Sequence, residues 1–146
     1  MTVSRAHSRE ILRGMSSEDV EIFRRAIDAL NRADVEAIPE LADPEVVLEP
    51  LRAPVSGAYI GHQGMRQFFA DTAETFGRFW IELDDVRDLG DDRVLVLGTM
   101  HARVRLGGLE TEATTAGIAT FRDGRVIHWK DLGDRAKAVE AAGFQS

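Results

Sequence analysis

The chain contains no cysteine, and it has only one tyrosine and two tryptophans. The absence of cysteine excludes disulfide bonds, thiolate metal ligands and a cysteine nucleophile. No apolar run approaches the roughly 18 residues that a membrane-spanning helix requires, so we expect no membrane partner. The N-terminal segment carries arginines but no apolar signal-peptide core, and we therefore expect a cytoplasmic protein.

Basic residues are in the minority: 25 Asp and Glu stand against 18 Lys and Arg, for a formal net charge of -7. This charge repels phosphate backbones, so we expect no nucleic-acid partner. The four histidines show no metal-ligand spacing such as HxxxH, and no Gly-rich phosphate-binding motif is present. The sequence therefore predicts no metal site and no cofactor.

The length of 146 residues fits one domain that buries its own core without a staple. Met15-Ser16-Ser17 precedes the first helical pattern. We therefore expect residues 1–15 to form a mobile N-terminal extension and residues 16–146 to form a single domain.

Helical spacing or capping residues mark four segments. They are a helix over about 17–31 with Val20, Phe23, Ile27 and Leu30 on one face, a short helix capped by Asp34 and interrupted by Pro39, a helix from about His62 with Met65, Phe69, Thr72 and Phe76 on one face, and a final helix from Asp134 through Ala142.

Strand patterns fill the rest of the chain, with a turn predicted at Asp43-Pro44. They cover about 46–49, 80–89, 93–106, 109–122 and 125–132. Gly107-Gly108 and Asp123-Gly124 predict tight hairpin turns between the last three strands. This order predicts an α+β fold in which a curved antiparallel sheet packs against helices and encloses a pocket.

Five stretches carry a resemblance to a known family: EDVEIFRRAIDALNRADVEAI, LADPEVVLEP, YIGHQGMRQFF, DDRVLVLGTMHARVRL and TFRDGRVIHWKDLGDRAKAVEAAG. Over about residues 17–143 the chain resembles the SnoaL-like proteins of the nuclear-transport-factor-two-like superfamily. That superfamily includes ketosteroid isomerases, limonene-epoxide hydrolases, polyketide cyclases and dehydratases, and members without known activity. The resemblance implies a cone-shaped, strongly curved antiparallel sheet packed against three to four helices, a cystatin-like α+β barrel with one apolar pocket. It also implies a homodimer formed through the exposed sheet face, but it does not choose among the activities.

Glu49 is the first candidate for chemistry. It ends the first predicted strand, and alternation puts it on one face with Val47. If that face points into the cone, burial would raise the pKa of Glu49 toward the range of a general base. The stretch LADPEVVLEP resembles the isomerase segment whose Asp-Pro supplies the base, with Glu49 at that Asp. The alternative is a Glu49 that points to solvent or pairs with an arginine.

The remaining isomerase machinery is absent from the sequence. The position resembling its oxyanion-binding tyrosine is Ala26, and the strand expected to carry a second acid reads Thr114-Thr115-Ala116-Gly117. Without strong donors at a developing oxyanion, ketosteroid isomerisation is disfavoured.

Asp131 is the second candidate, because alternation places it on the same strand face as Ile127 and Trp129. The stretch HWKDLGD is similar to an epoxide-hydrolase stretch that places a catalytic aspartate near the pocket. The Arg-x-Asp pair that epoxide opening also needs is missing from the neighbouring strand. The alternative is a structural carboxylate bound to an arginine or to a backbone amide.

His101 is the third candidate, because a histidine in mid-strand could exchange protons near neutral pH, paired with Glu49 or Asp131. The alternative is that His101 lies on the outer sheet surface with Arg103 and Arg105, because antiparallel sheets often expose one face to water.

Small residues at Ala113, Thr115, Gly117 and Ala119 either leave room for a ligand or allow close packing. We expect ligand contacts from Val47, Tyr59, Met65, Phe69, Ala119, Phe121 and Trp129. Two functions stay open. The first is an enzyme that acts on a small hydrophobic molecule by general acid/base isomerisation, cyclisation, dehydration or epoxide hydrolysis. The second is a non-catalytic small-molecule-binding or dimeric interaction module.

Overall fold

The computed structural model describes residues 18–50 and 57–143, so the predicted N-terminal extension lies outside the described residues. The helical elements are a helix over residues 18–31, the 3-10 turn η1 (Val35–Ala37), α2 (Ile38–Leu41), α4 (Gly61–Thr75) and α5 (Arg135–Ala141). The strands are β1 (Ala42–Glu49), β2 (Tyr59–Ile60), β3 (Phe76–Gly90), β4 (Arg93–Val104), β5 (Glu110–Arg122) and β6 (Arg125–Asp131).

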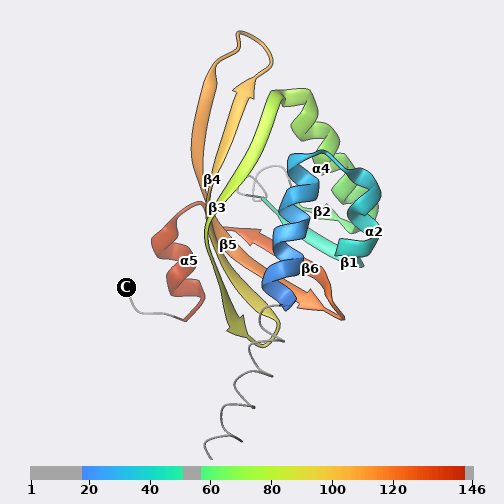
Figure 1. Ribbon diagram of the computed structural model, residues 1–146, viewed down its shortest axis with the longest axis vertical. Coiled ribbons are helices and arrows are strands. Elements are labelled where there is room, and N and C mark those ends of the chain that lie inside the picture. The colour runs from blue at the N-terminus through green and yellow to red at the C-terminus, as the bar shows by residue number, and fades with distance from the viewer. Residues whose placement is uncertain (1–17, 51–56, 144–146) are drawn as a thin grey trace, which may run out of the picture.

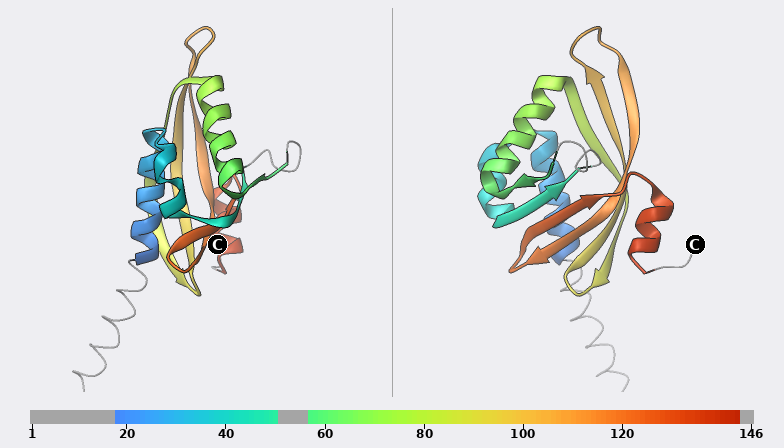
Figure 2. Two further views of the ribbon diagram at one scale, coloured as in Figure 1. Left: turned by 90° about the vertical axis from the view of Figure 1, so that its right-hand side faces the viewer. Right: turned by 180° about the vertical axis from the view of Figure 1, so that it is seen from behind.

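The strands form one curved six-stranded sheet in the order β2-β1-β6-β5-β4-β3 (Figure 1). All neighbours pair antiparallel except β1 and β6, which run parallel. The predicted α+β class and the curved sheet are confirmed. The helix over residues 18–31 and α4 cover one face of the sheet, and α5 lies against the opposite face (Figures 1 and 2).

The two faces of the sheet follow from alternation along β4. Val94 and Val96 belong to the main core, which lies under the helix over residues 18–31 and α4. Leu95 and Leu97 point the other way and pack with Ala138 of α5 in a second cluster. We call these the inner face and the outer face. None of the helices in the described ranges is long and apolar enough to span a membrane.

Turn chemistry decides where the long strands reverse. Asp123 and Gly124 both have positive φ, at 52° and 76°, as the predicted two-residue hairpin turn between β5 and β6 requires. Gly107 and Gly108, at 87° and 65°, lie between β4 and β5. Asp134 accepts a hydrogen bond from the Lys137 amide, which confirms the predicted cap of the last helix.

Three local predictions are wrong. Asp34 makes no side-chain cap hydrogen bond. Asp43-Pro44 lies inside β1 instead of forming a turn, in a region where the pairing register of β1 with β6 shifts. The third helix ends at Thr75 and β3 begins at once with Phe76, so Phe76 is not helical. The apolar pattern did not reveal this boundary, because an apolar residue at the end of a helix fits both the period of the helix and that of the strand that follows.

Candidate functional site

Asp131 ends β6 on the same face as Trp129, beside Gly117 of β5. The neighbouring Leu132 packs with the outer cluster, which places Asp131 on the inner side of the sheet. Burial raises the pKa of the Asp131 carboxyl above its ordinary value, while hydrogen bonds from the amides of Gly133 and Ala116 oppose that rise. The Gly133 amide donates to Oδ1 over 2.8 Å. A carboxyl whose pKa burial has raised can exchange a proton closer to neutral pH.

Trp129 lies next to Asp131 and is held from two sides. Its ring is 5.6 Å from that of Phe23 in the helix over residues 18–31. A side chain at Gly117 would come within 2.9 Å of the Trp129 ring and would collide with the backbone carbonyl of Lys130. Glycine at position 117 is therefore what allows β6 and the indole to approach β5 this closely.

A second aromatic group comes from β2 and α4. Tyr59 and Phe68 meet edge to face, with ring centroids 5.3 Å apart. The Tyr59 hydroxyl donates to Asp71 Oδ2 over 2.7 Å, and this hydrogen bond is the largest cause that raises the pKa of Tyr59. With Met65 and Trp129, these rings are partly buried against the main core. Of these side chains, Trp129 lies on the same strand face as Asp131.

Glu49 lies on the other face of the sheet. Val46 and Leu48 enter the core, so Glu49 points away from it together with Val47. Its Oε2 is 2.5 Å from Nε2 of His128, and both side chains are about one-third exposed. The partner of Glu49 is thus a histidine and not the arginine that the sequence suggested. The parallel pairing of β1 and β6, which brings the two residues together, has no local signal in the sequence.

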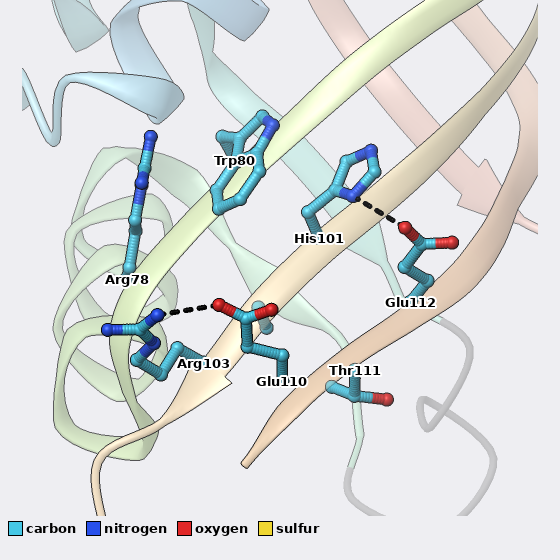
Figure 3. A pocket seen from close by; sticks show the side chains of 8 residues that line it. Arg78, Trp80, His101, Arg103, Glu110, Thr111 and Glu112 are labelled. Carbon is cyan, nitrogen blue, oxygen red and sulfur yellow. Dashed lines mark hydrogen bonds and ion pairs between the residues drawn. The ribbon is translucent and has the colours of Figure 1, made fainter. Parts of the chain in front are cut away.

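His101 also lies on the outer face, with Leu95 and Leu97 of the same strand. Its imidazole stacks on Trp80, with centroids 4.8 Å apart and planes 9° apart. Its Nδ1 is 3.3 Å from Glu112. This group belongs to a hollow of about 270 Å³ that is lined by Arg78, Trp80, His101, Ala102, Arg103, Glu110, Thr111 and Glu112. Figure 3 shows His101 beside Trp80 and directed toward Glu112. His101 is therefore separated by the sheet from Asp131.

The predicted ligand-contact residues do not form one group. Val47 points away from the core with Glu49, so the prediction that it lines the inner face is wrong. Phe69, Ala119 and Phe121 are at most 7% exposed and are part of the solid core. Tyr59, Met65 and Trp129 are partly buried at its border. The small residues of β5 also differ in their surroundings. Trp129 and the Lys130 backbone fill the space at Gly117, whereas Ala113 is exposed.

No group of three or more His, Cys, Asp or Glu side chains that could hold a metal ion occurs within residues 18–50 and 57–143. Of the three predicted catalytic residues, Asp131 alone lies on the inner face of the sheet.

Comparison with known proteins adds a family and a set of similar folds. A family model described as SnoaL-like domain matches residues 23–129. Among curated proteins, none matches the chain in sequence.

Solved structures share the fold at low identity. TerC, co-crystallised with polyporic acid, is 22% identical with a TM-score of 0.70, over 86% of this chain and 98% of its own. Bal32a, from a soil-derived mobile gene cassette, is 24% identical with a TM-score of 0.71, over 86% and 96%. An LEH-like epoxide hydrolase from M. tuberculosis is 16% identical with a TM-score of 0.67, over 86% and 85%.

Proposed function

The chain belongs to the SnoaL-like domain family, and we propose that it binds a small, largely hydrophobic molecule on the inner face of its sheet and transfers a proton to or from it without a cofactor. Asp131 is the proton-transfer group, and Trp129, Tyr59 and Met65 are apolar contacts for the molecule. The single observation that carries the proposal is the half-buried Asp131 carboxyl on the same strand face as Trp129, with its pKa raised by burial.

The chemistry follows from the surroundings of Asp131. Desolvation makes the ionised carboxylate a stronger base than it would be in water. The carboxylate accepts a proton from an acidic C–H or O–H group of the bound molecule and returns it at another position. In isomerisation and cyclisation the proton returns to the same molecule. In dehydration it leaves with the hydroxyl group as water, and in epoxide hydrolysis it is taken from the attacking water and given to the ring oxygen. The similar fold of an LEH-like epoxide hydrolase supports this range without selecting within it.

Glu49 and His101 lie on the outer face and are not assigned to this step. The Glu49–His128 contact and the His101–Glu112 contact give these side chains local partners instead.

Binding can be located by the two tryptophans, because they lie on opposite faces. Trp80→Phe leaves Trp129 as the only indole, and Trp129→Phe leaves Trp80. We would titrate each variant with polyporic acid, a steroid, a terpenoid and a polyketide. Quenching of Trp129 emission with little change at Trp80 supports the inner face. The reverse pattern would move the site to the outer hollow and contradict the proposal.

Catalysis is tested with the ligand that binds. In D2O, the wild-type protein should catalyse deuterium incorporation into that ligand, and Asp131→Asn should reduce the rate by about 10² to 10⁴-fold. Asp134→Asn is the matched control, because asparagine preserves the cap of α5. Undiminished exchange in Asp131→Asn would refute the role of Asp131.

A non-catalytic binding module is the second candidate function. It is favoured by the hydrogen bond that ties Asp131 to the Gly133 amide, which is the arrangement expected of a structural carboxylate. Trp129 quenching without any deuterium incorporation in the wild-type protein would select it.

We also propose a homodimer that uses the outer face of β3, β4 and β5. Trp80 reaches this face, and Leu106 and Leu109 at the β4–β5 turn are 90% and 69% exposed. Sedimentation equilibrium should give twice the monomer mass for the wild-type protein and the monomer mass for Leu106→Asp/Leu109→Asp. A wild-type monomer would refute the dimer.

A further inference from the structure

The connection from β6 to α5 crosses from one side of the sheet to the other. Asp131 is on the inner side, Leu132 packs with the outer cluster, and α5 begins at Arg135 against the outer face. Figure 2 shows α5 on the side of the sheet opposite to α4. Only three residues separate the acid from the helix, so a displacement of α5 must be absorbed next to the carboxylate.

Two contacts fix this connection at its start. The Leu132 amide donates to the Ala116 carbonyl over 2.7 Å. The Gly133 amide is shared between Asp131 Oδ1, at 2.8 Å, and the Ala116 carbonyl, at 3.3 Å. Gly133 has a φ of 68°, a left-handed conformation that favours glycine. The amide that binds the carboxylate therefore lies at the bend of the chain.

The other end of the connection is held by α5. Ala138 is fully buried against Leu95 and Leu97. Arg135 donates to Asp84 Oδ2 of β3 over 2.8 Å, and Thr99 of β4 donates to the same oxygen over 3.2 Å. The helix is thus attached to the outer face by the apolar contacts of Ala138 and Val139 and by the ion pair of Arg135.

We propose that α5 is the positioning element for Asp131: docked on the outer face, it holds the Gly133 amide against the carboxylate and so fixes the orientation of the acid on the inner face. Arg135 and Asp84 are positioning residues in this scheme, since neither touches the carboxylate. The inference rests on the proposed function only in that Asp131 is the acid that is positioned.

Hydrogen-bond donors to a carboxylate stabilise its charged form. When α5 detaches, Gly133 loses the support of the helix that follows it and is held only through the Ala116 carbonyl of β5. The Gly133 amide then binds the Asp131 carboxylate less persistently, and the pKa of Asp131 should rise further above its ordinary value. The charged side chains on the adjoining elements are Lys130 and His128 of β6, Glu49 of β1, Glu112 and Arg122 of β5, Asp84 of β3, and Asp134, Arg135, Lys137 and Glu140 in and next to α5. None of them is a cause of the Asp131 pKa shift, which comes from burial and the two amides.

The test is a ¹³C NMR titration of the Asp131 side chain in the full chain without ligand. Arg135→Ala and Asp84→Asn each break the ion pair, but they change the local charge in opposite directions. A purely electrostatic effect would raise the Asp131 titration midpoint in the first variant and lower it in the second. Detachment of α5 raises the midpoint in both, by about half a pH unit or more.

Two further variants keep the outcome decisive. Ala138→Gln places a bulky neutral side chain under α5 and detaches it without adding charge, and amide hydrogen exchange over residues 135–141 reports the detachment. Lys137→Ala, an exposed position in the same helix, is the control for lost positive charge. An Asp131 midpoint that stays unchanged in Ala138→Gln, or falls in Asp84→Asn, would overturn the proposal.

The same measurements separate this inference from the proposed function. The titration needs no substrate, so a raised midpoint in a protein that incorporates no deuterium refutes the catalytic function and leaves the positioning role intact.

Discussion

Replacing Asp19 by asparagine should stabilise the protein at neutral pH. Asp19 belongs to the helix over residues 18–31 and is only 9% exposed. Burial raises the pKa of its carboxyl to about 6, and the nearby carboxylates of Asp92 and Asp88 add to the rise. In the unfolded chain the ordinary value of 3.8 applies. The folded protein therefore holds a proton on Asp19 over a pH range in which the unfolded chain has lost it.

The consequence for stability has a definite sign. Below pH 3.8 the group is protonated in both states and costs nothing. As the pH rises from 3.8 through about 6, the unfolded chain ionises more readily, and the free energy of unfolding decreases. The full difference between the two pKa values corresponds to about 3 kcal/mol. Because the carboxyl is only partly desolvated and salt screens the two neighbours, we expect about 1 to 2 kcal/mol.

The assay is urea unfolding of the wild-type protein and Asp19→Asn at pH 4 and pH 8. The variant should be more stable by about 1 to 2 kcal/mol at pH 8 and nearly equal to the wild-type protein at pH 4, since asparagine mimics the protonated acid. Asp28→Asn, an exposed position on the same helix, should change little at either pH. Equal stability of Asp19→Asn and the wild-type protein at pH 8 would show that the surroundings of Asp19 do not destabilise its ionised carboxylate.

Two further substitutions test how the strands and helices are held. Gly117→Ala should destabilise the protein by about 2 kcal/mol or more, because its new methyl group collides with the Lys130 carbonyl. Gly77→Ala, whose methyl group would have 3.8 Å to its nearest neighbour, should change the free energy of unfolding by no more than about 0.5 kcal/mol. Thermal unfolding compares the two variants, and equal losses of stability would be inconsistent with the close approach at position 117. Asn31→Ala removes two hydrogen bonds to the backbone of Ile81, at 2.8 and 3.0 Å, and should cost about 1 to 3 kcal/mol, against little for the exposed Arg32→Ala; unchanged urea unfolding of the asparagine variant would contradict that estimate.

Local signals predicted the elements whose formation depends on neighbours in sequence. Asp123-Gly124 specified a hairpin turn because both residues tolerate positive φ, and Asp134 specified the start of α5 because its carboxylate caps a nearby amide. The same kind of signal was misleading at Asp43-Pro44. Asp43 pairs there with Arg122, a residue 79 positions away, and the dipeptide is part of β1.

The candidate site was predictable in part. The residue pattern correctly placed Asp131 and Trp129 on one face of one strand, since alternation is a property of the strand alone. The residue pattern could not decide which face of β1 points into the core, and the position of Glu49 depends on that choice. Both faces of this strand carry apolar residues, so neither face is preferred. The contact between Glu49 and His128 was equally hidden, because it requires the parallel pairing of β1 with β6.

The sequence by itself therefore determined the family, the helices, every strand but the two-residue β2, and the hairpin turns between the last three strands. These features depend on short-range periodicity and turn chemistry. The tertiary structure alone decided that Asp131 lies inward while Glu49 and His101 lie outward, and that α5 crosses to the outer face. Those outcomes depend on which strands become neighbours and how the sheet bends, and both are set by packing between residues far apart in the chain.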